Sequence, residues 1–184
     1  MGQVHALRFG LCRRIAQSTC RGCGWNSSCS LRVIELAMSG APFQIVLVED
    51  TELDVFLIRK ALEQAGVLFE LQVLGNGEEA LEFISKIDSD KSAPLPHLII
   101  LDLNLPRVNG GQVLEGVRRS LRCASVPALV LTSSDSPKDR ALVSQFTATQ
   151  YFQKSSSLDE FMSLGPMIRE LLERGDSSSR ACAN

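Results

Sequence analysis

Short apolar runs alternate with segments of helical periodicity along most of this chain. An apolar run of strand length, bounded by polar residues, is typical of a strand that is buried on both faces of a sheet. Apolar residues that recur every three or four positions are typical of an amphipathic helix. The alternation predicts five strand–helix pairs. The predicted strands are 44–49, 69–74, 97–102, 127–132 and 149–153, and the predicted helices are 52–65, 77–87, 110–121, 137–147 and 157–174.

This alternation predicts how the strands are arranged. Strands that are separated by helices form a parallel sheet, and right-handed crossovers place the helices on both of its faces. We therefore predict an α/β fold with a doubly wound five-stranded parallel sheet of strand order 2-1-3-4-5. In such a sheet the first and third strands flank the point where the winding reverses, and ligands bind there at the carboxyl ends of the strands.

Charged residues end three of the predicted strands. Glu49 and Asp50 follow the first apolar run, Asp102 follows the third, and Lys154 follows the fifth. Because the carboxyl ends of parallel strands open onto one crevice, three acids and one lysine are expected to meet there. Carboxylates that lie close together repel one another unless a cation compensates them, and a divalent metal with oxygen ligands does so. The set therefore predicts a phosphoryl-transfer site.

Four segments carry a resemblance to a known family. They are residues 46–50, 101–106 with Gly110, 131–134 and 151–154. They resemble the receiver domains of two-component response regulators, over about residues 42–174. The resemblance implies the flavodoxin-like (βα)5 fold of receivers. Within the family, residues 48–62 and the pair Lys154-Ser155 look most like the single-domain regulators that are paired with phytochrome-type histidine kinases.

The resemblance implies a Mg²⁺-dependent phosphoacceptor site. Asp102 would accept the phosphoryl group, a role that a carboxylate nucleophile at a strand end can perform. Asp50 would bind Mg²⁺ directly and Glu49 would bind it through water, because Mg²⁺ takes one or two carboxylates and keeps several waters. Asp102 itself and the backbone carbonyl of Asn104 would complete the protein ligands.

Residues at two further strand ends would respond to phosphorylation of Asp102. The hydroxyl of Thr132 and the ammonium of Lys154 would each contact a phosphoryl oxygen on Asp102 and compensate its charge. Tyr151 matches the switch aromatic of the family, which packs inward when Thr132 moves toward the phosphate. Without the family, Thr132 reads as a structural strand residue, Lys154 as a solvated surface lysine and Tyr151 as a partly exposed tyrosine.

The sequence departs from the family in two places. Most receivers have proline in a cis bond after the lysine, whereas Ser155 follows Lys154 here. A non-proline cis bond costs about 2.5–4 kcal/mol, so either the bond is trans or neighbouring contacts force it. In addition, Glu52 places a further acid next to the metal pair. It would alter autodephosphorylation there, or else simply favour the helix dipole.

The charge and cysteine content argue against several classes of function. Five of the 19 basic residues but only one of the 21 acids lie within residues 1–37, so the remaining body is acidic. An acidic body argues against non-specific nucleic-acid binding, and no DNA-binding output segment is visible. No segment has the continuous apolar length of a membrane span. The few cysteines imply no disulfide framework and suit a reducing compartment, so a cytoplasmic protein is expected.

The chain termini are expected to lie outside the domain. Residues 1–40 have no sustained periodicity and are predicted to be a disordered extension, with Met38 as an alternative start. An organellar transit peptide and a zinc site at Cys20, Cys23 and Cys29 are alternatives for this segment. The receiver domain is predicted at 41–174, and the polar residues 175–184 are predicted to be a disordered tail.

The predicted function is that of a response regulator that takes a phosphoryl group from a histidine kinase, possesses no classical enzyme activity, and signals to an unidentified reader. A pseudo-receiver that only mediates interactions and a Mg²⁺-dependent aspartyl phosphatase are alternatives. The phosphatase lacks a general acid, because Asn104 stands where its second Asp would be. A flavin mononucleotide binder is disfavoured, because the acidic loop 49–52 would repel a phosphate.

Apolar residues on the last two predicted helices indicate a homodimer. Helix 157–174 carries more apolar residues than one stripe against the sheet should bury. Phe161 or Leu172 would then lie outside that stripe. We therefore expect a two-fold pairing through helix 137–147, strand 149–153 and helix 157–174, with a monomer that has a wide core-facing stripe as the alternative.

Overall fold

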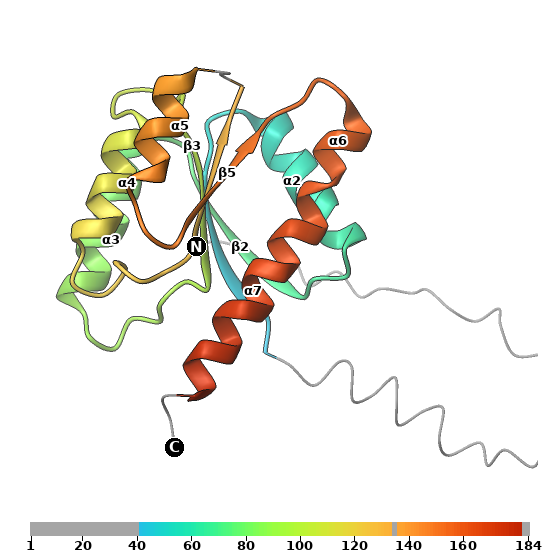
Figure 1. The fold of residues 1–184 in the computed structure, drawn as a ribbon. Coiled ribbons are helices and arrows are strands. Elements are labelled where there is room, and N and C mark those ends of the chain that lie inside the picture. Colours follow the sequence, from blue (N-terminus) through green and yellow to red (C-terminus); the bar gives the residue numbers. More distant parts are fainter. Residues whose placement is uncertain (1–40, 134–135, 182–184) are drawn as a thin grey trace, which may run out of the picture. The chain divides into compact units, whose positions relative to one another are not determined.

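Five parallel strands form the centre of the fold. The computed structural model describes residues 41–133 and 136–181, with the backbone alone for 175–181. The strands form one sheet in the order β2-β1-β3-β4-β5, which confirms the predicted α/β topology (Figure 1). The first and last residues of the strands are close to those predicted from the sequence. The strands are β1 (Phe43–Val48), β2 (Phe69–Leu74), β3 (Leu98–Asp102), β4 (Ala128–Thr132) and β5 (Thr149–Gln153).

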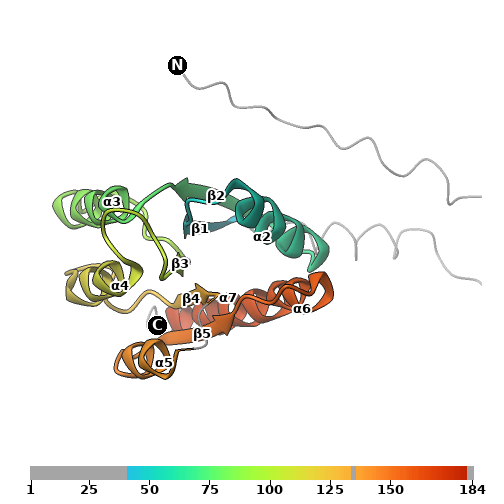
Figure 2. The same ribbon diagram turned by 90° about the horizontal axis from the view of Figure 1, so that it is seen from above.

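Helices cover both faces of the sheet. The view from above shows helices on both sides of the sheet (Figure 2). The first layer consists of α3 (Gly77–Ser89), α4 (Gly110–Arg119) and α5 (Pro137–Ser144). The second consists of α2 (Glu52–Gln64), α6 (Leu158–Met162) and α7 (Leu164–Ala181).

Each face of the sheet has its own hydrophobic core. Along β1, Val46 and Val48 belong to the cluster under α3 and α4, whereas Ile45 and Leu47 belong to the cluster under α2 and α7. Successive side chains of a strand point to opposite faces, so both sets are buried. This explains why the strands appear in the sequence as continuous apolar runs.

The prediction of a single last helix over 157–174 is wrong. The structure has two helices, α6 and α7, with Ser163 capping the first. Pro166 gives the reason, because inside a continuous helix its ring would clash with the carbonyl of Met162, four residues earlier. Gly165 then lets α7 start close to α2, since a Cβ atom at Gly165 would come within 2.2 Å of the carbonyl oxygen of Ala61.

The expectation that Phe161 or Leu172 lies outside the core-facing stripe is also wrong. Both side chains are buried in the core on the α2 and α7 side of the sheet. The break between the two helices lets α6 and α7 each turn its own apolar stripe toward the sheet. The burial of Phe161 and Leu172 removes this argument for the homodimer, which stays a prediction. On α6, Leu158 is the large apolar residue that is exposed.

The remaining differences concern the ends of helices and the chain termini. Helices α4 and α5 end before the predicted residues 121 and 147, while α7 continues past the predicted residue 174. The predictions for residues 1–40, including Met38 and the cysteine site, lie outside the described residues, and disorder of the tail stays a prediction. None of the helices in the described part of the chain combines the length and apolar character that a bilayer crossing requires.

Candidate functional site

The register of the sheet brings four predicted residues to one edge. Val48 pairs with Leu101, so the next residues, Glu49 and Asp102, come at the same level. Thr132 ends β4 beside Asp102, because Leu131 is the partner of Asp102. Gln153 pairs with Thr132, and the backbone N–H of Lys154 then donates to the carbonyl of Thr132 at 2.8 Å. The predicted convergence at the carboxyl end of the sheet is therefore present for Glu49, Asp102 and Lys154.

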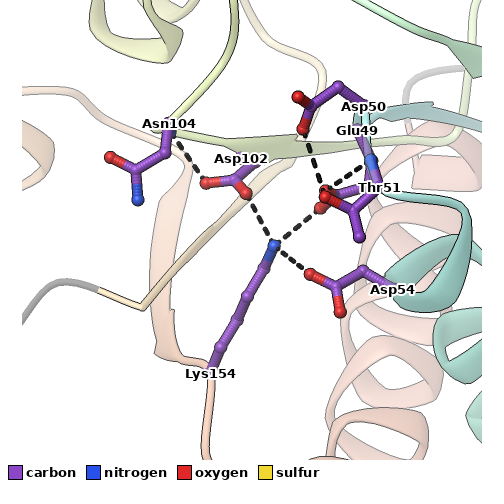
Figure 3. Close-up of polar contacts among 7 residues, drawn as sticks. All are labelled: Glu49, Asp50, Thr51, Asp54, Asp102, Asn104 and Lys154. Carbon is purple, nitrogen blue, oxygen red and sulfur yellow. Dashed lines mark hydrogen bonds and ion pairs between the residues drawn. The ribbon is translucent and has the colours of Figure 1, made fainter.

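The ammonium of Lys154 lies at the centre of this edge. Its Nζ donates to Oε2 of Glu49 at 2.7 Å, to Oδ2 of Asp102 at 2.6 Å and to Oδ2 of Asp54 at 2.6 Å (Figure 3). An ammonium has three protons, so three acceptors use all of them. The side chain of Lys154 is only 8% exposed. It is therefore a buried member of the site rather than the solvated surface lysine that its sequence position alone would suggest.

Asp102 is held at both carboxylate oxygens. Oδ1 accepts from the backbone N–H of Asn104 at 2.8 Å, and Oδ2 accepts from Lys154. The side chain of Asn104 itself is exposed. The first residue of α4, Gly110, packs behind Asp102 and donates its N–H to the carbonyl of Leu103 at 3.0 Å. The orientation of Asp102 thus depends on the loop that follows β3.

Gly110→Ala is expected to destabilise the protein by about 2–3 kcal/mol, the upper range for overpacking a core. A Cβ atom at this position would come within 2.1 Å of the backbone oxygen of Asp102 and within 2.7 Å of Leu103 Cα. Urea unfolding measures the change. Gly75→Ala is the matched control, because the nearest atom to its Cβ is 3.9 Å away. Equal stability of the two variants would contradict the close packing behind Asp102.

The charges of the cluster do not balance. Three carboxylates share one ammonium. The positive charge of Lys154 is therefore stabilised by three acids, whereas each acid shares the stabilisation from one lysine with two others. Burial raises the pKa of Glu49, and the bond from Lys154 only partly opposes it. Burial disfavours the charge on Lys154, but the hydrogen bonds that its ammonium donates to Asp102, Asp54 and Glu49 outweigh this and raise its pKa above the ordinary value.

Sequence reasoning missed Asp54. This residue lies in the first turn of α2, and one of its carboxylate oxygens lies within 4.8 Å of those of Glu49 and Asp102. Asp50, predicted to bind the metal directly, is exposed and lies outside this group of three, with its Oδ1 3.4 Å from the hydroxyl of Thr51. Glu52, the further acid that the sequence indicated, is exposed. The acidic first turn of the predicted helix was the signal that could have pointed to Asp54.

The other predicted residues lie around the cluster. Thr132 is fully buried at the end of β4. Tyr151 is partly buried on β5, and the guanidinium of Arg140 lies 5.3 Å from the centre of its ring. The bond between Lys154 and Ser155 is trans, since the described residues contain no cis peptide bond. This answers the question that the missing proline raised.

The donor set suits a hard divalent cation. Glu49, Asp102 and Asp54 each offer a carboxylate oxygen, and these oxygens lie within 4.8 Å of one another. Mg²⁺ and Mn²⁺ prefer such oxygen ligands, and the cluster has more negative charge than Lys154 alone can neutralise. The residues present therefore fit a divalent cation, with Asp50 at the rim as a further oxygen donor.

Comparison with known proteins gives one consistent family. The response regulator receiver domain model matches residues 45–164. The probable methanogenesis regulatory protein FilR2 of Methanothrix harundinacea is 33% identical over 129 residues, covering 70% of this chain and 83% of FilR2. Response regulator Rcp1 of Synechocystis is 31% identical over 126 residues, covering 68% of this chain and 86% of Rcp1.

Solved structures give the same picture. The phosphorylated cyanobacterial phytochrome response regulator RcpA matches with a TM-score of 0.64 and 30% identity, covering 72% of this chain and 94% of RcpA. The Mn²⁺-bound form of Rcp1 matches with a TM-score of 0.62 and 31% identity, covering 69% of this chain and 91% of the Rcp1 structure. Both similarities extend over most of the described residues.

Proposed function

The chain belongs to the response regulator receiver domain family, and we propose that Asp102 is its phosphoacceptor, within a receiver domain at residues 41–174. Receiver domains are signalling modules that accept phosphorylation and are not classical enzymes. The observation that carries the proposal is the position of Asp102 at the carboxyl end of β3, with its carboxylate 2.6 Å from the ammonium of Lys154. A nucleophilic carboxylate next to a cation is what phosphoryl transfer to a side chain requires.

The proposed reaction moves one phosphoryl group. A carboxylate oxygen of Asp102 bonds to phosphorus while the bond between phosphorus and the donor, a histidine nitrogen of the kinase, breaks. The product carries roughly −1.5 to −2 charges, which Lys154 and the hydroxyl of Thr132 compensate. We propose that Thr132 then moves toward the phosphate and that Tyr151 follows it inward, which changes the surface of β5 and α5 that a partner reads.

A divalent cation is part of the proposal. Its chemistry is to neutralise the acids and the phosphoryl oxygens as they approach one another. Receivers bind Mg²⁺ or Mn²⁺ at an acidic pocket, and the similar solved structures include a Mn²⁺-bound form of Rcp1. In this chain Glu49, Asp102 and the carbonyl of Asn104 would hold Mg²⁺, with Asp50 joining from the rim.

Asp50→Ala is expected to raise the Kd for Mg²⁺ by about tenfold, because a hard cation loses a charged oxygen donor. A Mg²⁺ titration followed by NMR of backbone amides measures the Kd. Glu52→Gln is the matched control, since it removes one exposed acid two residues further along the chain, at the start of α2. If the two variants bind Mg²⁺ equally well, Asp50 is not a ligand.

The proposed donor is a histidine kinase in the cytoplasm. Receiver domains interact with such kinases, and RcpA is by its description a phytochrome response regulator, which supports a phytochrome-type kinase as the partner here. Incubation with acetyl phosphate and Mg²⁺ tests the function. A receiver incorporates about one phosphoryl group per chain, whereas a phosphatase releases phosphate continuously. A pseudo-receiver incorporates none, and that result would overturn the proposal.

A further inference from the structure

The ammonium of Lys154 and a divalent cation would need the same carboxylates. In the structure Lys154 uses its three protons on Glu49, Asp102 and Asp54, all at 2.6–2.7 Å. Under the proposed function, Glu49 and Asp102 also hold the cation. The two positive charges then repel each other across a short distance in a buried site. Lys154 must keep contact with Asp102 under these conditions, or it cannot neutralise the phosphoryl group.

Asp54 is placed to solve this problem. It comes from α2, a different element from the strands that carry the other two acids, and its side chain is 22% exposed against 0% for Glu49 and 6% for Asp102. Asp54 therefore lies at the outer side of the cluster. There its Oδ2 accepts a charge-assisted hydrogen bond from Lys154 at 2.6 Å.

We propose that Asp54 anchors the ammonium of Lys154 beside Asp102 while Glu49 and Asp102 bind the divalent cation. In this role Asp54 is a positioning residue that acts through Lys154 and is not itself a ligand of the cation. The inference rests on the proposed function, because it concerns the same phosphorylation reaction. Without Asp54, repulsion by the cation would move the flexible lysine side chain toward solvent.

Asp54→Asn is expected to slow phosphorylation by acetyl phosphate at saturating Mg²⁺ by about tenfold, the loss that one charge-assisted hydrogen bond represents. Glu63→Gln removes an exposed acid from the same helix, one that pairs with Lys60 and does not contact Lys154, so its rate should stay within about twofold of wild type. Asp54→Glu keeps a carboxylate on a longer side chain and should recover part of the rate. Backbone amide spectra of each variant check that the fold is intact.

A double-mutant cycle with Lys154→Met separates an anchor from a ligand. If Asp54 acts through Lys154, Asp54→Asn should change the rate by less than about twofold once Lys154 is absent. A persistent tenfold loss in the Lys154→Met background would show that Asp54 acts directly on the cation, and would overturn the inference. If the wild-type chain is labelled and the Asp54→Asn variant is labelled at the same rate, the inference is overturned and the proposed function remains. A wild-type chain that takes no label overturns both.

Discussion

Asp102→Asn should abolish labelling by acetyl phosphate and Mg²⁺, with a loss of at least about 100-fold. Asparagine has the shape of aspartate, so the loop after β3 can keep its form, but an amide is no nucleophile toward phosphorus. The same variant should accept no phosphoryl group from a cognate histidine kinase. Radiolabel or phosphate-affinity gels measure both reactions.

Asp159→Asn provides the matched control for this experiment. Asp159 is an exposed acid on α6 and takes no part in the three-acid cluster, so its substitution should leave labelling within about twofold of wild type. Full labelling of the Asp102→Asn variant would remove Asp102 from its role. Mass spectrometry of the labelled wild-type chain would then locate the acceptor.

Lys154→Met should lower the free energy of unfolding by about 3 kcal/mol in the absence of divalent cations, the lower end for removing one partner of a buried ion pair. Glu49, Asp54 and Asp102 would lose the ammonium that they share, and methionine fills the space of the lysine stem without its charge. Burial raises the pKa of Glu49, so its charged form is the less costly one to give up when the ammonium is lost, which is why the lower end applies.

Mg²⁺ should restore most of this lost stability, because it supplies the missing positive charge. Urea unfolding with a chelator and with Mg²⁺ measures both effects. Lys60→Met is the control, since Lys60 pairs with Glu63 on the surface and should change stability by less than about 1 kcal/mol in either condition. A Lys154→Met variant as stable as Lys60→Met without Mg²⁺ would show that the acids do not depend on Lys154.

The sheet could be predicted from the sequence because its strands are buried on both faces. Residues such as Ile45 and Val46 face opposite layers, yet both are core residues, so the apolar run appears without interruption. The chemistry at the strand ends followed from the topology, and Glu49, Asp102 and Lys154 meet as expected. Element ends and helix breaks were harder, because Pro166 lies within a pattern that is periodic on both sides of it.

Asp54 could not be found from strand ends alone. Its approach to Lys154 depends on the angle at which α2 leaves the sheet, and tertiary packing of α2 against α7 sets that angle. Asp50, adjacent to Glu49 in the sequence, points instead to the rim, because successive residues at a strand end face different directions. Proximity to Glu49 in the sequence therefore did not predict which further acid shares the ammonium of Lys154.

The three acids around one ammonium give the folded protein a stability–function trade-off. In the unfolded chain water solvates these charges separately, whereas folding buries Glu49 and Asp102 together with a surplus of negative charge. Substitutions that neutralise Glu49 or Asp102 would relieve this repulsion in the metal-free protein and would impair the chemistry at the same time. A substitution at this site that raises thermal stability is therefore expected to impair signalling. Stabilising substitutions are better placed in the hydrophobic cores on the two faces of the sheet.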